Sequence, residues 1–297
     1  MKNLITFTLA VIICLSLGSD ASAATIIVNP GQSIQTAINS AVNDDTIIVQ
    51  PGTYTENINM SEKAITLRSS DPTNPAIVTS TIINGGASGR VITCDSGEDS
   101  DCIISGFVIT NGTGGIYCSA SSPTVSNCTF SGNTTDHGGG MFNYDYSSPI
   151  VTDCTFSSNT ASNHGGGMHN FYYSSPTVIN CTFSSNTANQ YGGGMHNSYR
   201  SSPTVTGCTF SSNTATYYGG GMYNYDYSSP VLTGSYFCSN TPDTIYGSYT
   251  NNGGNNLVFC PPPQPIEPKI IGDLDGDGDV DFKDFAMMAN NWLVGTD

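Results

Sequence analysis

A repeated segment spans residues 121–241 and constrains this chain more than any other feature. Four copies carry SSPxV, CTFS, NT and GGGM in the same order, and a fifth, less regular copy follows. Their shared phenylalanines lie 26 residues apart once and 27 residues apart three times. Self-similarity at this period is typical of stacked repeats rather than of a globular core. The phenylalanines are Phe130, Phe156, Phe183, Phe210 and Phe237.

Each copy places its apolar residues at fixed positions, which predicts how one coil is built. Short apolar pieces between Gly, Asn and Ser-Pro turns indicate three short strands per coil. Equivalent side chains then stack in inward columns, with neighbouring strands about 4.8 Å apart. An asparagine three residues after each phenylalanine is expected to bond to its neighbours through stacked amides, and GGG to supply positive-φ positions or close backbone approach. The columns are Val125, Val151, Val178 and Val205; Cys128, Cys154, Cys181 and Cys208; Met141, Met168, Met195 and Met222; and Asn133, Asn159, Asn186, Asn213 and Asn240.

Residues 1–23 have the pattern of a secretory signal peptide. Lys2 gives a positive start, residues 4–18 are apolar, and Ala21 to Ala23 form a small-residue cleavage site. The apolar run of about 15 residues is shorter than the ~20 that span a bilayer as a helix. We therefore expect an exported, secreted or cell-surface chain with no membrane span after signal removal.

The segment after the signal peptide resembles the N-terminal cap of a known fold. Ile34, Ala37, Ile38 and Ala41 recur at helical spacing within residues 33–42 and predict an amphipathic helix. Such a helix suits the exposed apolar end of a solenoid. With the run TIIVQPGTY at 46–54, the chain resembles right-handed parallel β-helix proteins of the pectin-lyase-like class. The resemblance implies an all-β parallel β-helix over residues 24–258, with an N-terminal helical cap.

The repeated segment itself also resembles a known repeat. FxxN paired with GGGM is similar to the repeats of bacterial polymorphic outer-membrane proteins, whose β-helices are linked to adhesion. Upstream of the repeats, Phe107 and Ile109 lie 21 residues before Cys128 and Phe130. They predict one further coil that continues the same inward columns.

Residues 273–284 have the pattern of a calcium-binding loop. They read DLDGDGDVDFKD, which places acidic side chains at EF-hand positions 1, 3, 5, 9 and 12, a glycine at 6 and a carbonyl donor at 7. So many carboxylates repel one another unless a cation lies among them. The expected calcium ligands are Asp273, Asp275, Asp277, Asp279, Asp281 and Asp284.

This loop and the helix expected after it resemble one half of a dockerin module. Phe282, Phe285, Ala289 and Trp292 give the expected helix an apolar face, and the Pro-rich residues 259–270 predict a stiff linker before it. The resemblance implies that residues 271–297 bind calcium and tether the protein to a cohesin-type partner. Dockerins usually carry two such loops and this chain shows one, so Ca²⁺-dependent folding or surface association is the alternative role.

The charge balance excludes one class of partner. The chain has 7 Lys and Arg against 23 Asp and Glu, for a net charge of −16. Phosphate binding needs clustered Lys and Arg, so nucleic acid is not an expected partner. Cations are the more natural partners of such a chain.

Acidic and basic residues in the repeats do not form the pairs that catalysis needs. Arg200 is the only basic residue in the phased copies, whereas uronate lyases need a cationic group and a base. Asp145 and Asp226 share a column three coils apart, roughly 14 Å by strand spacing. That exceeds the roughly 6.5–9.5 Å of an inverting glycosidase pair, so we assign no catalytic residue.

Four histidines occupy two columns of the repeats. His169 and His196 share one column, and His137 and His164 share the other. Phenylalanine or tyrosine takes the same positions in other copies, which favours ring stacking over metal coordination.

An aromatic segment follows each GGGMxN motif. Neighbours along a strand face opposite ways, so some rings must be exposed along one side of the solenoid. Exposed aromatic rings suit stacking against sugar rings, and covering the turns is the alternative role. The candidate glycan-binding residues are Tyr144, Tyr172, Tyr199 and Tyr225.

The cysteines outside the signal peptide fall into two groups. Export permits disulfides, and Cys94 with Cys102, or Cys238 with Cys260, are candidate pairs. The pairing among these four and Cys118 stays open. The four cysteines of the repeat column are expected to be buried thiols.

These observations predict a secreted, calcium-binding β-helix protein. The main hypothesis is a non-catalytic scaffold that binds a polysaccharide or cell-surface glycan and is tethered through its dockerin-like tail. The alternative is a polysaccharide-degrading enzyme, either a glycoside hydrolase or a polysaccharide lyase, of the pectin-lyase-like class.

Overall fold

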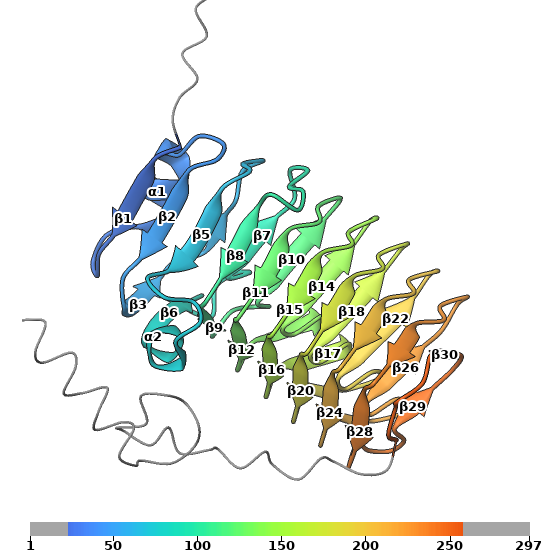
Figure 1. The fold of residues 1–297 in the computed structure, drawn as a ribbon. Coiled ribbons are helices and arrows are strands. Elements are labelled where there is room, and N and C mark those ends of the chain that lie inside the picture. Colours follow the sequence, from blue (N-terminus) through green and yellow to red (C-terminus); the bar gives the residue numbers. More distant parts are fainter. Residues whose placement is uncertain (1–22, 258–297) are drawn as a thin grey trace, which may run out of the picture.

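Successive coils of a parallel β-solenoid form the described part of the chain. The computed structural model describes residues 23–257, and its coils stack along one axis from the N-terminal to the C-terminal end (Figure 1). In the repeats one coil consists of β11 (Thr124–Ser126), β12 (Thr129–Ser131), β13 (Thr134–His137) and β14 (Met141–Tyr144). The next coil begins at β15 (Ile150–Thr152), and every strand pairs in parallel with its counterpart one coil away.

The strands form four sheets along the sides of the solenoid. Sheet A contains β1 (Thr25–Val28), β2 (Thr46–Val49), β5 (Thr66–Ser69), β8 (Ile103–Ser105), β11, β15, β19 (Thr177–Ile179), β23 (Thr204–Thr206), β27 (Val231–Thr233) and β30 (Thr250–Asn251). Sheet B contains β3 (Gly52–Thr55), β6 (Thr81–Asn84), β9 (Val108–Thr110), β12, β16 (Thr155–Ser157), β20 (Thr182–Ser184), β24 (Thr209–Ser211) and β28 (Tyr236–Cys238). Sheet C contains β4 (Ile58–Asn59), β7 (Ile92–Cys94), β10 (Ile116–Ser119), β14, β18 (Met168–Phe171), β22 (Met195–Ser198), β26 (Met222–Asn224) and β29 (Ile245–Tyr246). Sheet D contains β13, β17 (Thr160–His164), β21 (Thr187–Ala188) and β25 (Thr214–Ala215).

Sheet D corrects the expectation of three strands per coil. The repeats have a fourth, between the asparagine column and the GGG triplet, at β13, β17, β21 and β25. These segments are short and polar, so their sequence pattern indicated turns rather than strands. They pair with the next coil because the coils on either side already hold them at strand spacing, as in Thr160↔Thr187 and Ala161↔Ala188.

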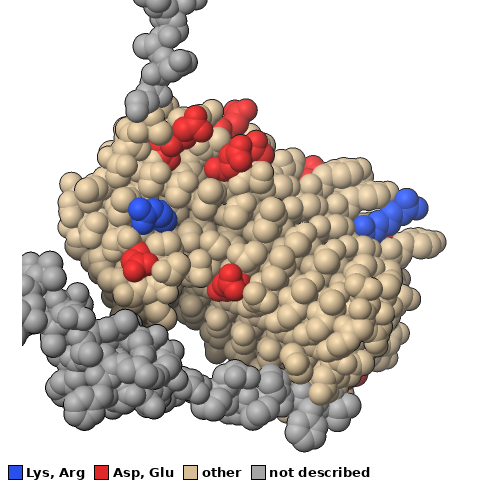
Figure 2. Space-filling view, in the orientation of Figure 1, with Lys and Arg blue, Asp and Glu red and all other residues tan. Residues whose placement is uncertain are grey.

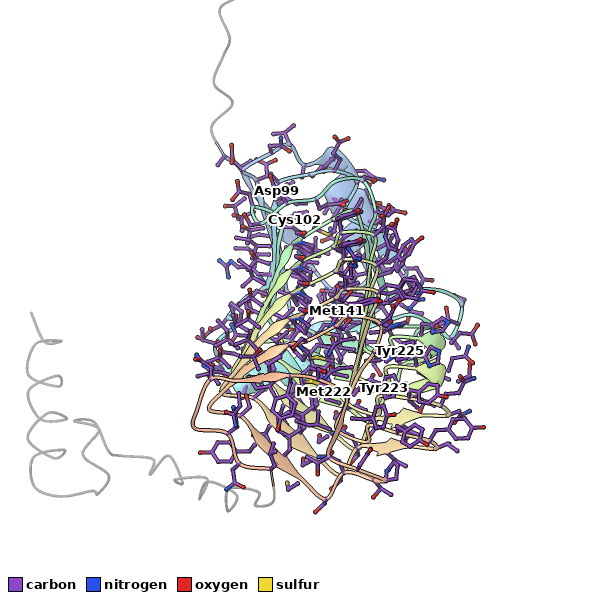
Figure 3. All side chains as sticks on the ribbon, turned by 90° about the vertical axis from the view of Figure 1, so that its right-hand side faces the viewer. Asp99, Cys102, Met141, Met222, Tyr223 and Tyr225 are labelled. Atoms are coloured by element: carbon purple, nitrogen blue, oxygen red, sulfur yellow. The ribbon has the colours of Figure 1, made fainter. Side chains whose placement is uncertain are left out.

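The predicted inward columns are confirmed. The valines, cysteines, phenylalanines and methionines of the repeats are buried, and Met141 and Met222 lie inside the coil in Figure 3. The phenylalanine rings stack in parallel, with centroids 4.4–4.6 Å apart. Ile109 pairs in register with Phe130, so the further coil predicted upstream is also present.

Two asparagine ladders satisfy polar groups inside the turns. In the predicted ladder, Asn159 Nδ2 donates to Asn186 Oδ1 at 3.0 Å and to the carbonyl of Phe130 at 2.9 Å. The same two bonds recur in neighbouring coils. A second ladder lies two residues after each methionine, where each side-chain amide donates to the next at 2.8 Å. It contains Asn143, Asn170, Asn197 and Asn224.

The GGG triplets allow the backbones of successive coils to approach closely. The first glycine of each triplet has a positive φ, as in Gly165 at +68°. A Cβ atom on the second would lie 2.5 Å from a backbone oxygen of the next coil at Gly166. Only glycine fits both positions, which confirms the two roles predicted for the triplet.

An amphipathic helix lies against the first strands, as the spacing of its apolar residues predicts. Helix α1 spans Ile34–Ser40, and Ile34, Ala37 and Ile38 are buried. Ser33 caps it by accepting a hydrogen bond from the backbone N–H of Thr36, and the Glu56 carboxylate accepts two more N–H bonds in the first turn. Its role as a cap of the solenoid stays a prediction. A second helix, α2 (Pro75–Ser80), packs beside β6 and β9.

The buried cysteines are mostly free. Cys128, Cys154, Cys181 and Cys208 are buried thiols, as predicted for the repeat column. Cys94 and Cys102 are also free, so the candidate bridge between them is wrong for this structure. Cys94 instead pairs in register with Cys118 across β7 and β10, and all three thiols are buried in the core. Cys238 is disulfide-bonded, but its predicted partner Cys260 lies outside the described residues, so that pairing stays a prediction.

Several predictions fall outside residues 23–257. The signal peptide up to residue 22, the linker at 259–270 and the dockerin-like residues 271–297 with their calcium ligands are not among the described residues. Within the part that is described, no helix is long and apolar enough to cross a membrane.

Candidate functional site: an aromatic and histidine groove

A groove of about 680 Å³ lies along the outer face of sheet C, next to sheet D. Its lining comes from successive coils, so it runs along the solenoid axis. The lining is almost entirely aromatic. It consists of Tyr117, His137, Phe142, Tyr144, His164, His169, Phe171, Tyr191, His196, Ser198, Tyr199, Tyr223 and Tyr225.

Strand alternation in sheet C produces the floor of the groove. In the motif MxN the methionine and the asparagine point inward, so the residue between them points outward. These outward residues pair in register from coil to coil, as Phe142↔His169 and His169↔His196 show. The floor column is Tyr117, Phe142, His169, His196 and Tyr223. In Figure 3, Tyr223 and Tyr225 lie outside the coil, whereas Met222 lies inside it.

The wall of the groove is formed by the residue that precedes each GGG triplet. His137, His164 and Tyr191 occupy this position in successive coils. The sharp turn at the positive-φ glycine brings the wall residue back over the floor. A Cβ atom on Gly165 would lie 2.7 Å from the Cβ of His169, so only glycine allows this approach.

Wall and floor bring all four histidines together. His137 lies with its ring centroid 5.2 Å from that of His164 and 5.3 Å from that of His169. His196 lies 4.7 Å from His164 and 4.5 Å from His169. The sequence indicated two separate columns, because nothing in the repeat spacing shows that the wall folds over the floor.

Ring stacking, predicted for both columns, is confirmed. His169 stacks on Phe142 at 5.0 Å with planes 10° apart. His164 stacks on Tyr191 at 5.4 Å with planes 28° apart. Other neighbours in these columns are tilted against each other, as are His169 and His196 with planes 34° apart.

The histidines are held in their neutral form. Burial lowers the pKa of each ring, most strongly for the fully buried His169 and His196, and the pKa of His164 falls to about 4. The other histidines lower the pKa of His164, His169 and His196 further through charge repulsion. Several ring nitrogens are buried without a hydrogen-bond partner: Nδ1 of His137, His164, His169 and His196, and Nε2 of His169.

An arginine stands at the N-terminal end of the groove. The Arg90 guanidinium lies 5.4 Å from the centroid of Tyr117 and 5.8 Å from that of Phe142. Its Nη1 donates to the carbonyl of His137 at 3.4 Å. Gly114 makes room for it, since a Cβ there would collide with the guanidinium. Arg90 was not among the predicted site residues, because it precedes the phased repeats. The only signal for it in the sequence was a basic residue two coils before the first histidine.

Three of the four predicted glycan-binding tyrosines line the groove. They are Tyr144, which is half-buried, and Tyr199 and Tyr225, which are 49% and 61% exposed. Tyr172 is 39% exposed but lies on the adjacent turn, where its ring contacts Tyr144 at 6.5 Å. The sequence indicated the column of His169 and His196 that forms the floor, but not that this column and these tyrosines line one groove.

Carboxylates do not contribute to the groove. Among residues 23–257 no Asp or Glu lines it. Asp136, which is next to His137 in the sequence, accepts a hydrogen bond from Ser162. Most of the face drawn in Figure 2 likewise carries no charged side chain.

The sequence places the chain in a family. Residues 20–237 match the family model described as "Right handed beta helix region", and the chain therefore belongs to the right-handed β-helix family. The structure agrees, because parallel coils continue from β1 to β30. No curated protein matches the sequence.

Solved structures with a similar fold share little sequence with this chain. Pectin methylesterase from carrot aligns with a TM-score of 0.50 at 12% identity, over 82% of this chain and 90% of that chain. A pectin methylesterase from Aspergillus niger gives 0.49 at 11% identity, over 80% and 90%. An alginate lyase from Paenibacillus sp. gives 0.43 at 14% identity, over 80% and 98%.

Proposed function

We propose that this chain is a polysaccharide-acting β-helix protein that holds a glycan in its aromatic groove. The observation that carries the proposal is the groove itself, in which aromatic side chains from successive coils line one continuous face. Apolar ring faces pack against sugar rings, and tyrosine hydroxyls bond to sugar hydroxyl groups.

The shape of the groove suits a long ligand better than a small one. Its lining repeats once per coil, so each step along the axis presents a similar surface about 4.8 Å further on. A polymer of similar units meets a matching contact at each step. Tyr199 and Tyr225 stay exposed at the edge, where stacking on a sugar would remove apolar ring surface from water.

Of the two hypotheses from the sequence, the enzyme is better supported than the non-catalytic scaffold. Pectin methylesterase from carrot shares this fold over 82% of the chain. The groove also contains groups that stacking alone does not use, namely neutral imidazoles and a guanidinium. We therefore favour a polysaccharide-degrading enzyme.

The groups present restrict the chemistry of such an enzyme. Glycoside hydrolysis by two carboxylates finds no pair in the groove. Around Phe142 lie Tyr117 at 5.7 Å, Arg90 at 5.8 Å and His137 at 6.0 Å. This set offers a cation for a substrate carboxylate, a neutral imidazole as base and a phenol as acid, which are the groups that β-elimination on a uronate requires.

A panel of plant, algal and animal polysaccharides tests the proposal. We expect the full-length protein to be retarded by at least one polysaccharide in affinity gels, and unsaturated products absorbing in the ultraviolet to accumulate from an acidic one. Binding without any product would restore the scaffold hypothesis. The absence of both binding and product from every member would contradict the proposed function.

We also propose that the protein is secreted and that its tail binds Ca²⁺. The pattern of carboxylates at 273–284 supports this proposal, and tethering to a cohesin-bearing partner is the role that the dockerin resemblance implies. We expect Asp273→Ala to weaken calorimetric Ca²⁺ binding by at least about 10-fold, because it removes a first-position ligand. Asp243→Ala, which lies in the solenoid, serves as the control and should leave binding unchanged. Equal Ca²⁺ affinity for both variants and the parent protein would contradict the assignment.

A further inference from the structure

Three of the four groove histidines lie mutually close enough to share one ion. We propose that His137, His164 and His169 bind a divalent transition metal of the zinc class, with water in the fourth position. The inference goes beyond glycan binding and is tested without a glycan. It rests on the positions of the rings and on their unpartnered nitrogens.

The spacing of the rings matches one metal centre. In a tetrahedral site with Zn–N bonds of about 2.0–2.1 Å, imidazole centroids lie roughly 5 Å apart. His137, His164 and His169 have centroid separations of 5.2, 5.3 and 5.9 Å. His196 lies 4.7 and 4.5 Å from His164 and His169, but it is two coils away from His137 and is not counted as a ligand.

Several nitrogens of these rings have no hydrogen-bond partner. Each of the four rings has a buried Nδ1 without a hydrogen-bond partner, and His169, only 2% exposed, has neither nitrogen bonded. A buried polar atom without a partner destabilises the fold, so a metal bound there would offset that cost for several atoms together. Metal binding requires neutral imidazole, the form in which burial holds these rings.

The rings must turn before they can bind a metal. In their present orientation, no group of three or more His, Cys, Asp or Glu side chains among residues 23–257 is set to hold a metal ion. The centroid of an imidazole lies close to the axis of its Cβ–Cγ bond, so turning the ring redirects the nitrogens with little movement of the centroid. That torsion has a broad distribution in histidine. Binding exchanges the stack of His169 on Phe142 for a metal–nitrogen bond.

The ligand set selects the class of metal. Imidazole nitrogens suit Zn²⁺, Co²⁺, Ni²⁺ or Cu²⁺, whereas Ca²⁺ and Mg²⁺ prefer oxygen ligands. The groove therefore selects a different class of metal from the carboxylate loop of the tail. Co²⁺ binding to the groove can be measured while Ca²⁺ is present.

Cobalt spectroscopy tests the proposal on the full-length, untagged protein. Co²⁺ is titrated in excess Ca²⁺, which occupies the tail loop, and the visible absorption of four-coordinate Co²⁺ is followed. We expect one Co²⁺ per chain and its displacement by Zn²⁺. Absence of this absorption at millimolar Co²⁺ would overturn the proposal.

The repeats provide substitutions that the fold already accepts. Tyrosine occupies the column of His164 at Tyr191, and phenylalanine occupies that of His169 at Phe142. We expect His164→Tyr with His169→Phe to weaken Co²⁺ binding at least about 30-fold and to leave the melting temperature of the metal-free protein unchanged or higher. The single variant His137→Tyr, at a half-exposed position, repeats the test if the double variant folds poorly. Asp275→Ala in the tail should keep the absorption; its loss there, or its persistence in the histidine variants, would overturn the assignment.

Discussion

Replacing Phe183 by alanine should destabilise the solenoid by about 3–5 kcal/mol, which is the usual cost of removing a fully buried phenylalanine. Its ring is fully buried and lies 4.6 Å from the rings of Phe156 and Phe210 on either side. The substitution would leave a cavity in the middle of the column. Strand pairing holds the neighbouring coils in register, so they cannot move together to fill it. The measurement is the urea midpoint of unfolding followed by circular dichroism.

Phe171→Ala is the matched control. Phe171 lies in sheet C, outside the inward phenylalanine column, and is only partly buried at the edge of the groove. It should shift the midpoint much less than Phe183→Ala does. Equal shifts for the two variants would show that the inward column is not the main source of stability.

Asn186→Ala should destabilise the protein by roughly 3 kcal/mol or more, because it leaves several buried polar groups without partners. Asn186 Nδ2 donates to the Phe156 carbonyl at 2.9 Å and to Asn213 Oδ1 at 3.0 Å. Its Oδ1 accepts from the backbone N–H and the Nδ2 of Asn159, at 3.1 and 3.0 Å. The carbonyl and both donors of Asn159 would lose these bonds in a site that water does not reach.

Asn189→Ala tests whether the ladder position matters. Asn189 is exposed three residues further on, so its replacement should leave the midpoint of unfolding nearly unchanged. At low pH, where the carboxyl is protonated, Asn186→Asp keeps the shape, the acceptor and one of the two donors, so it should lie between wild type and Asn186→Ala. A midpoint for Asn186→Ala within error of that for Asn189→Ala would contradict the role of the ladder.

The repeats make most of the fold predictable from sequence. A fixed period places equivalent residues above one another, so the register of Phe130 with Phe156 follows from counting. Side-chain alternation then assigns each position to the inside or the outside. Sheet D was missed because its short polar strands depend on pairing with neighbouring coils, which local pattern does not show.

The groove was harder to predict, because it depends on contacts across the coil rather than along the columns. The period shows that His164 lies above His137 and that His196 lies above His169. It does not show that the turn at Gly165 places His164 within 5.9 Å of His169. Arg90 was missed because it precedes the phased repeats, so their period does not place it near Phe142.

The histidines link the two proposals made for the groove. His169 stacks on Phe142 in the floor, and the buried ring nitrogens would have to turn outward to reach a glycan or a metal. Comparing glycan binding with and without Zn²⁺ would show whether the two ligands compete for these nitrogens.

Calorimetric titration of groove variants with the polysaccharide selected by the panel tests the central claim most directly. Tyr144→Ala with Tyr225→Ala removes two rings from the groove, and Tyr227→Ala removes an 84% exposed ring from the adjacent turn. We expect the double variant to bind at least about 10-fold more weakly, as the loss of two stacking contacts implies, and the control to bind like wild type. Unchanged affinity in the double variant, or an equal loss in the control, would contradict the assignment of the groove as the glycan-binding site.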